Sequence, residues 1–260
     1  MDHSAQTVLV TGASSGIGAA FAREVARRGS DLVLVARRAE RLEALAAELT
    51  AAHGTTVEVV PADLALPGAA EEVTGEIERR GVRVTSLVNN AGFGDHGRVH
   101  DQDPARLQEI VAVNVGALVG LSRGLLPALR EGDGYLLNVA SLAAYQPIPD
   151  LAVYAATKAF VLSFTEALWY ESKGTRLRVL CLSPGMTGTE FFDVAGAGAG
   201  TSGRKQTVEQ VVATALKALD RRDGPPSVVS GGMNRLTSGL NRLLPRRTTV
   251  ELTARATSSR

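Results

Sequence analysis

The sequence predicts an α/β fold in which helices cover both faces of a doubly wound, parallel sheet of six to seven strands. Short apolar runs rich in β-branched residues alternate with longer segments of helical periodicity along most of the 260 residues. These runs are continuously apolar rather than alternating, which indicates strands buried on both faces of a parallel sheet. The strands are expected at residues 7–10, 31–36, 57–60, 86–89, 135–139, 178–182 and 228–229.

Helical segments separate the strands, and the chain is expected to form one domain over residues 1–260. The clearest helical patterns cover residues 17–28, 38–53 and 151–173. A Gly/Ala/Ser-rich stretch follows the sixth strand and predicts a loop at about 186–205. No stretch of the sequence has the composition of a linker between two domains.

The composition is that of an ordinary globular protein, with a net charge of +1 and 45% hydrophobic residues. The single cysteine, Cys181, excludes an intramolecular disulfide, and the four histidines lack the spacing of metal ligands, so no metal is expected. The first residues are polar, and polar residues and a proline interrupt the longest apolar stretch, 111–129. We therefore expect a cytoplasmic location, and the charge balance predicts no nucleic-acid partner.

The first predicted strand runs into a glycine-rich turn, residues 11–18, which precedes a helix. Glycines permit a tight turn and a close approach of the backbone to a pyrophosphate, whose charge is favoured by the helix N-terminus. Glycines alone are weak evidence, but a strand, a GxxxGxG turn and a helix in this order predict a dinucleotide site. Its contacts are expected from Gly12, Ser14, Ser15, Gly16, Ile17 and Gly18.

The end of the second predicted strand indicates which dinucleotide is bound. A site that prefers NAD carries an acidic residue here for the adenosine ribose, whereas this chain has Ala-Arg-Arg at residues 36–38. Arginine forms charge-assisted hydrogen bonds with a 2′-phosphate, so NADP(H) is predicted over NAD(H), with Arg37 as the first candidate contact. The alternative is that both arginines simply begin a solvated helix.

A tyrosine and a lysine, Tyr154 and Lys158, lie four residues apart in a predicted helix and therefore share one face. The reference pKa of tyrosine is about 10, and an ammonium about 4 Å away stabilises the phenolate by about 4 kcal/mol at an effective dielectric of about 20. Ser141 follows the fifth predicted strand and is a candidate hydrogen-bond donor to a substrate oxygen. A YxxxK pair by itself is also common on helix surfaces.

Over about residues 7–190 the chain resembles the short-chain dehydrogenase/reductase family. The resemblance rests on motifs that occur in the family's order: residues 11–18, Asp63, Asn-Asn-Ala-Gly at 89–92, Asn114, Ser141, Tyr154 with Lys158, and Pro184-Gly185. It implies a Rossmann-like fold and an NAD(P)-dependent oxidoreductase that interconverts a ketone or aldehyde and an alcohol by hydride transfer.

The resemblance implies roles for four catalytic residues. Tyr154 would be the general acid in carbonyl reduction, and Lys158 would lower the pKa of Tyr154 and hold the nicotinamide ribose. Ser141 would orient the substrate carbonyl, and Asn114 would support a water that relays protons to the lysine.

The resemblance also implies the rest of the cofactor site. Asp63 and Leu64 would contact the adenine. The other residues would line the cleft toward the nicotinamide: Asn90, Ala91, Gly92, Pro184, Gly185, Thr187 and Thr189. For Thr11, Asn89 and Ala91 a purely structural role is an equal alternative.

The expected substrate wall is mostly apolar, which favours an acyl, steroid-like or aromatic carbonyl compound. The wall is predicted from residues 93–98, 143–149 and 186–203. Phe191 and Phe192 are expected either to close over the substrate or to pack in the protein. His96 is either a plain loop residue or a hydrogen-bond partner for a polar substituent.

The tail, residues 231–260, carries six arginines and one glutamate, a net charge of +5. Its leucines at 236, 240, 243 and 244 share one helical face. This pattern favours a helix that closes the substrate side or contacts a second subunit of a homodimer or homotetramer, and peripheral attachment to anionic membrane is the alternative.

Two other functions use the same fold. A non-catalytic NADP-binding regulator would keep the glycine turn but lose the tyrosine–lysine pair, and a nucleotide-sugar epimerase or dehydratase would have a longer chain.

Overall fold

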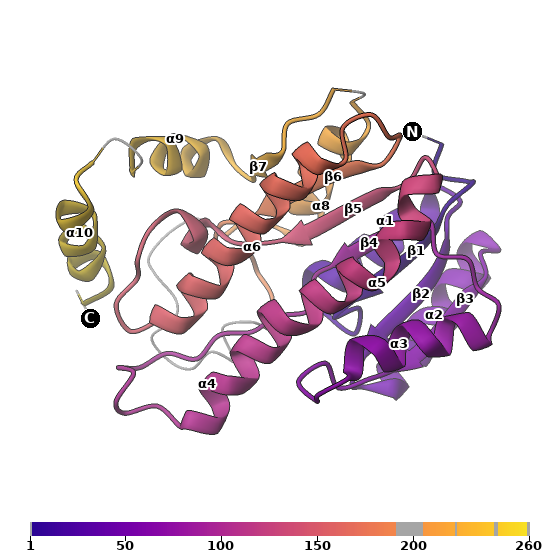
Figure 1. Cartoon of the computed structure of the whole chain (residues 1–260), viewed down its shortest axis with the longest axis horizontal. Coiled ribbons are helices and arrows are strands. Elements are labelled where there is room, and N and C mark those ends of the chain that lie inside the picture. Colours follow the sequence, from indigo (N-terminus) through magenta and orange to yellow (C-terminus); the bar gives the residue numbers. More distant parts are fainter. Residues whose placement is uncertain (1, 191–204, 222, 242–243, 259–260) are drawn as a thin grey trace.

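The computed structural model describes residues 2–190, 205–221, 223–241 and 244–258. Its centre is a seven-stranded sheet of order β3-β2-β1-β4-β5-β6-β7, in which every neighbouring pair is parallel (Figure 1). The predicted doubly wound fold is therefore confirmed. The strands are β1 Thr7–Thr11, β2 Asp31–Ala36, β3 Val57–Pro61, β4 Ser86–Asn89, β5 Tyr135–Val139, β6 Arg178–Ser183 and β7 Ser227–Val229.

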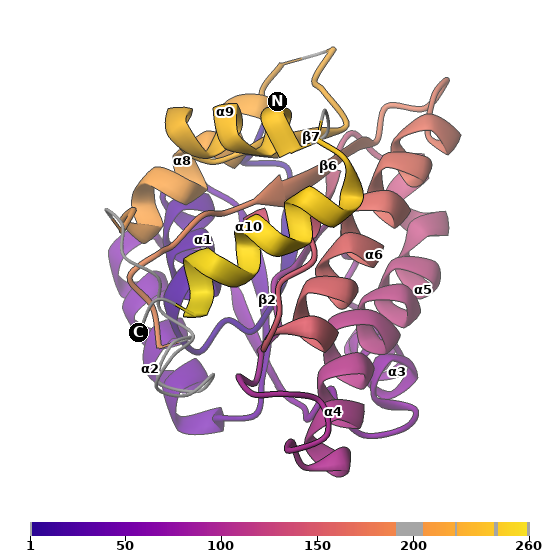
Figure 2. The same ribbon diagram turned by 90° about the vertical axis from the view of Figure 1, so that its left-hand side faces the viewer.

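Helices cover both faces of the sheet, and Figure 2 shows the two helical layers on either side of it. One layer contains α1, α2 and α8, and the other contains α3, α5 and α6. The helical elements are α1 Gly16–Arg27, α2 Ala39–His53, α3 Ala69–Arg79, α4 Pro104–Val111, the π-helix η1 Ala112–Ala117, α5 Leu118–Glu131, the 3-10 turn η2 Leu142–Tyr145, α6 Ala152–Glu171, α8 Val208–Leu219, α9 Gly232–Asn241 and α10 Arg246–Ser258.

The central strand β1 contributes side chains to the hydrophobic core on both faces of the sheet, because successive strand residues point to opposite faces. Val8 and Val10 belong to the cluster that includes Phe21 of α1, and Leu9 belongs to the cluster that includes Leu121 of α5. Full burial of such a side chain stabilises the fold by about 1.5–3 kcal/mol. This explains why the strands read as continuously apolar.

The continuous helical stretch Pro104–Glu131 is long and apolar enough, by length and composition, to cross a membrane. In the fold, its apolar residues Ile110, Leu121 and Leu129 are fully buried inside the protein. A π-turn interrupts this stretch at η1, and such turns frequently occur at functional sites.

Element ends differ by one or two residues from the expected ranges, because capping and turn geometry decide the last residue. Most of the predicted loop 186–205 lies outside the described residues, as do Phe191, Phe192 and Leu243. The described part of the loop is anchored to the chain beyond it, since Gln206 N donates to Met186 O at 2.8 Å and Gly188 N donates to Gln206 O at 3.1 Å.

The basic tail forms two helices, α9 and α10. The first packs near β7 and η2. The second lies beyond the carboxyl ends of the strands in Figure 1 and crosses in front of them in Figure 2. The tail therefore lies on the side of the sheet where a parallel α/β fold binds ligands.

Candidate active site

A cavity of about 900 Å³ lies at the carboxyl ends of the strands. The strand order reverses there, between β1 and β4, which is the position where open α/β sheets bind ligands. Of the predicted catalytic and cofactor-contact residues, all line this cavity except Gly18 and Asn114, and of the predicted substrate wall 93–98 only Phe93 and His96 do. Residues far apart in sequence, from Gly12 to Thr189, thus meet in one place.

The glycine turn has a backbone that only glycine adopts easily. Gly12 and Gly16 have φ angles of +65° and +55°, in the left-handed region. A side chain on Gly18 would overlap the carbonyl oxygen of Gly12, so Gly18 acts by allowing close packing rather than by touching a ligand. The side chain of Ser15 does not cap α1, which leaves the first-turn N–H groups for an anion. This cradle fits the pyrophosphate of a dinucleotide.

Hydrogen bonds tie the turn to the end of β4. The Thr11 hydroxyl accepts from the backbone N–H of Asn90 at 2.9 Å and of Ala91 at 3.0 Å. Asn90 Nδ2 donates to the carbonyl oxygen of Thr11 at 3.0 Å and to that of Gly12 at 3.4 Å. The geometry supports the structural role of Thr11, and it sets Asn90 at the cavity wall.

Asn89 takes part in a buried polar network rather than in the cavity. Its Nδ2 donates to Ser122 Oγ at 3.0 Å and to Asn138 Oδ1 at 2.9 Å. Asn138 Nδ2 in turn donates to Thr165 Oγ1 at 2.9 Å, so the network joins β4 and β5 to α5 and α6. This supports the structural interpretation of Asn89.

One end of the cavity carries arginines and acidic residues. Arg37, Arg38 and Asp63 all line it. Arg38 donates to Ser14 Oγ at 3.0 Å and to Ser15 Oγ at 2.9 Å, which links the end of β2 to the glycine turn.

Glu190 lies in the predicted substrate wall 186–203 and lines the cavity, but its contacts with arginines were not predicted from the sequence. It forms ion pairs with Arg38 at 3.0 Å and with Arg41 at 2.8 Å. These residues are about 150 positions apart in the chain, and no local motif marks the contact. Only the folded arrangement of the β6 and β2 ends brings them together.

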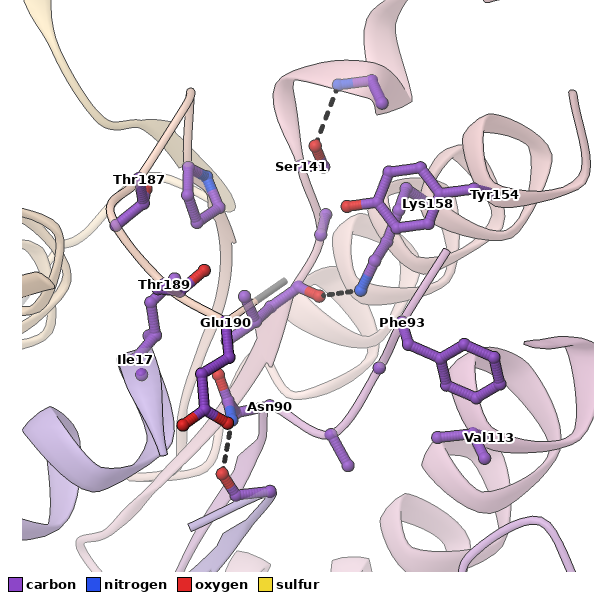
Figure 3. A pocket seen from close by; sticks show the side chains of 18 of the residues that line it. Ile17, Asn90, Phe93, Val113, Ser141, Tyr154, Lys158, Thr187, Thr189 and Glu190 are labelled. Carbon is purple, nitrogen blue, oxygen red and sulfur yellow. Dashed lines mark hydrogen bonds between the residues drawn. The ribbon is translucent and has the colours of Figure 1, made fainter. Parts of the chain in front are cut away.

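The other end of the cavity brings Tyr154, Lys158 and Ser141 together (Figure 3). Tyr154 and Lys158 come from α6, and Ser141 follows β5. Lys158 Nζ donates to the carbonyl oxygen of Val139 at 2.9 Å and lies 5.8 Å from the centre of the Tyr154 ring. The Tyr154 phenol is hydrogen-bonded to Ser141, whose Oγ also accepts from Ala143 N at 3.1 Å.

Burial controls the ionisation of both α6 residues. It raises the pKa of Tyr154 to about 12, against a smaller lowering by the Ser141 hydrogen bond, and it lowers the pKa of Lys158 to about 8. That Lys158 lowers the pKa of Tyr154, as the resemblance implies, stays a prediction, because the causes that act on this pKa here are burial and the Ser141 hydrogen bond. The ammonium of Lys158 is directed at the Val139 carbonyl, and desolvation is the largest effect on the pKa of the Tyr154 phenol.

Asn114 lies behind the cavity wall, where it is 1% exposed, rather than in the cavity. Its Oδ1 accepts from Phe93 N at 3.1 Å, and its Nδ2 donates to Phe93 O at 3.0 Å and to Thr157 Oγ1 at 3.0 Å. A side chain on Gly92 would come within 3.0 Å of Asn114 Oδ1 and 3.1 Å of Lys158 Nζ. Asn114 therefore acts on the site indirectly, because it hydrogen-bonds to the cavity residue Phe93.

The wall around Tyr154 is mostly apolar, and helix α10 supplies part of it. Its larger apolar side chains include Phe93, Val113, Leu142, Ile148, Leu151, Met186 and Leu252. Thr249 and Thr253 of α10 also line the cavity, and the polar lining residues include His96, Glu109 and Gln146. The position of α10 agrees with the interpretation of the tail as a helix that closes the substrate side.

Comparison with known proteins defines the class. Residues 6–199 match the family model described as short chain dehydrogenase. Sulfoacetaldehyde reductase 2 of Chromohalobacter salexigens is 39% identical over 194 residues, which are 74% of this chain and 76% of that protein. The chain therefore belongs to the short-chain dehydrogenase family, and it is an NAD(P)-dependent oxidoreductase.

Solved structures of the family share the whole architecture. A short-chain dehydrogenase from Sphingobium yanoikuyae in complex with NADPH has a TM-score of 0.80 and 34% identity, covering 93% of this chain and 97% of that one. A 7beta-hydroxysteroid dehydrogenase has a TM-score of 0.84 and 27% identity, covering 95% of this chain and 96% of that one. The fold is thus shared over nearly the full length of each chain.

Proposed function

We propose that the protein interconverts a ketone or aldehyde and an alcohol with NADP(H), using Tyr154 as the proton donor in reduction. One observation carries the proposal: Tyr154, Ser141 and Lys158 lie at one end of a single cavity whose other end is formed by the glycine turn and Arg37. A dinucleotide that spans this cavity supplies the hydride, and the protein supplies placement and the proton.

The preference for NADP(H) is supported by the charge at the adenosine end. Arg37 and Arg38 line this end, and Ser14 and Ser15 add hydroxyl groups beside Arg38. Guanidinium groups bind phosphate through paired, charge-assisted hydrogen bonds. The solved relative from Sphingobium yanoikuyae was determined with NADPH.

The proton chemistry follows from the environment of Tyr154. With a pKa of about 12 the phenol is protonated across the neutral range and can donate to a developing alkoxide. Ser141 is placed to orient the same oxygen, and the Lys158 ammonium stabilises the phenolate that remains after donation. Asn114 acts as a positioning residue through Phe93 and Thr157.

The proposed substrate is an uncharged, largely apolar carbonyl compound of acyl, steroid-like or aromatic type. Among the described lining residues, the lysine and arginine side chains are Arg37, Arg38 and Lys158, two of them at the adenosine end. An anionic substrate, such as the one in the name of the Chromohalobacter salexigens relative, needs a cation near Tyr154 other than the catalytic lysine. The apolar wall favours a neutral substrate instead.

A homodimer or homotetramer in the cytoplasm is the proposed working form. The outer side of α6 exposes Phe160, which stacks on Phe164 with ring centres 5.7 Å apart. Exposed aromatic side chains of this kind are typical of subunit contacts. Light scattering after size-exclusion chromatography measures the mass, and a monomer would contradict this part of the proposal.

The experiment that tests the proposed function is NADPH consumption with a panel of aliphatic, aromatic and steroid-like ketones and aldehydes. We expect turnover with apolar carbonyl compounds and much less with anionic ones. Binding of NADPH without turnover of any carbonyl compound would instead indicate the non-catalytic regulator. Binding of NADH but not NADPH would contradict the proposed cofactor preference.

A further inference from the structure

Glu190 pairs with two arginines near the adenosine end of the cavity, Arg38, which lines it, and Arg41 of α2. Its Oε2 pairs with Arg38 Nη1 at 3.0 Å and its Oε1 pairs with Arg41 Nη1 at 2.8 Å. The carboxylate thus spans two guanidinium groups, and Figure 3 shows the Glu190 side chain in the pocket. Both arginines hold the pKa of Glu190 below its usual value, Arg41 more than Arg38.

The partners of Glu190 form a phosphate-type donor set. Arg38 also donates to Ser14 Oγ and Ser15 Oγ, so two guanidinium groups and two hydroxyl groups lie together beside the glycine turn. A phosphate monoester accepts hydrogen bonds from groups of this kind. A phosphate on the same donors would meet the Glu190 carboxylate at short range, where like charges repel.

The backbone holds Glu190 in this position. Its neighbour Thr189 packs against the glycine turn, because a side chain on Gly16 would come within 3.1 Å of Thr189 Cγ2. Three residues earlier, Met186 O accepts from Gln206 N at 2.8 Å. The segment that carries Glu190 is therefore fixed by backbone hydrogen bonds and packing. This holds the carboxylate next to the arginines, whereas a pair of long side chains on an unconstrained surface has no such support.

We propose that Glu190 is a specificity-determining residue that competes with the 2′-phosphate of NADP(H) for Arg38 and Arg41. The inference rests on the proposed NADP(H) function and deepens it. A nucleotide with a 2′-phosphate must displace the Glu190 carboxylate from both guanidinium groups, whereas a nucleotide without it leaves the pairs in place. Glu190 therefore reduces the preference for NADP(H) over NAD(H) that the arginines create.

The size of the effect follows from exposure. The side chains of Glu190, Arg38 and Arg41 are 46%, 43% and 50% exposed, so solvent screens each pair. Exposed pairs contribute little individually, and two of them together correspond to about threefold to thirtyfold in binding. The effect should weaken as salt is added.

The test compares two adenosine fragments that differ by one group, 2′,5′-ADP and 5′-AMP, by isothermal titration calorimetry on the full chain. Glu190→Gln keeps the shape of the side chain and removes its charge. We expect it to tighten 2′,5′-ADP binding by about threefold to thirtyfold and to change 5′-AMP binding by less than about twofold. Glu43→Gln, an exposed residue of α2, is the matched control for net charge and should leave both affinities unchanged.

Two further variants separate competition from a general change in the site. Glu190→Ala should behave like Glu190→Gln, because the charge and not the amide matters. In an Arg41→Ala background, Glu190→Gln should increase the affinity for 2′,5′-ADP by a smaller factor, because Arg41, one of the two guanidinium donors paired with Glu190, is absent. An unchanged or reduced ratio of 2′,5′-ADP to 5′-AMP affinity in both Glu190 variants would overturn the inference.

The same titrations tell this inference apart from the proposed function. If the unaltered protein and the Glu190 variants all bind both fragments equally, the NADP(H) preference and the competition fail together. If the unaltered protein prefers 2′,5′-ADP and the variants keep the same preference, only the role of Glu190 is wrong. A preference that first emerges in the variants supports the competition.

Discussion

Lys158 of α6 donates a hydrogen bond to the carbonyl oxygen of Val139, the last residue of β5, at 2.9 Å. The contact holds the buried ammonium between the sheet and the cavity, one helical turn from Tyr154. Burial lowers the pKa of Lys158 to about 8, so keeping this charge in place costs folding free energy.

Replacing Lys158 with methionine should therefore stabilise the fold. Folding lowers the pKa of Lys158 from 10.5 to about 8, so the unfolded chain binds more protons than the folded one between these pH values. The free-energy cost of burying the charged lysine is therefore fully present below pH 8. Lys158→Met also removes the hydrogen bond to Val139, which offsets part of this gain. We therefore expect a net rise of about 1–2 kcal/mol in the free energy of unfolding at pH 7. Urea unfolding without added nucleotide measures it.

The pH dependence distinguishes this cause from a general packing gain. The advantage of Lys158→Met should shrink as the pH rises from 8 toward 10.5, where the lysine is neutral in both states. The exposed Lys217 of α8 provides the control, and Lys217→Met should change stability by less than about 0.5 kcal/mol. A pH-independent advantage would contradict the explanation.

The rate of carbonyl reduction should fall as Lys158 loses its charge. Below about pH 8 the ammonium stabilises the phenolate left by proton donation, and above it this stabilisation is lost while Tyr154 stays protonated. We expect kcat/KM for NADPH, which reports ionisations of the free enzyme, to be level below pH 8 and to decline above it. A level profile up to pH 10 would count against the role of Lys158.

Helix α10 should set substrate affinity without affecting the cofactor. Leu252 lines the cavity and Val250, on the same helix, does not. Leu252→Ala should raise KM for an apolar ketone by about threefold to tenfold and leave the NADPH dissociation constant unchanged. Val250→Ala is the matched control, and equal effects of the two variants on KM would show that α10 acts only through general stability.

The buried network around Asn138 should be important for stability. Asn138 is fully buried, accepts from Asn89 and donates to Thr165. Truncation leaves the Asn89 amide without this acceptor and opens a small cavity, so Asn138→Ala should cost about 2–4 kcal/mol in the free energy of unfolding. Denaturant midpoints test this, and a cost below about 0.5 kcal/mol would mean that the network contributes little.

The fold and most of the cavity lining could be predicted from sequence because the responsible signals are local. A glycine turn between a strand and a helix needs left-handed backbone at Gly12 and Gly16, and the i, i+4 spacing of Tyr154 and Lys158 is a property of one helix. The carboxyl ends of parallel strands meet at one edge, so motifs placed after strands converge without further information.

The contacts that escaped prediction depend on segments distant in the sequence. Glu190 meets Arg38 only because the ends of β6 and β2 face the same cavity. The ionisation of Tyr154 depends on how deeply α6 is buried, which spacing does not reveal. Helix periodicity indicated that the tail is amphipathic, but only the fold shows that Thr249 and Leu252 reach the cavity.

The central claim is that Tyr154 donates the proton, and Tyr154→Phe tests it most directly. We expect kcat for reduction of an apolar ketone to fall by about 10²–10⁴-fold, with the NADPH dissociation constant within about threefold of the original. Tyr170→Phe makes the same change at an exposed position of α6 and should leave kcat intact. A Tyr154→Phe enzyme that retains kcat within about tenfold of the unaltered protein would contradict the account.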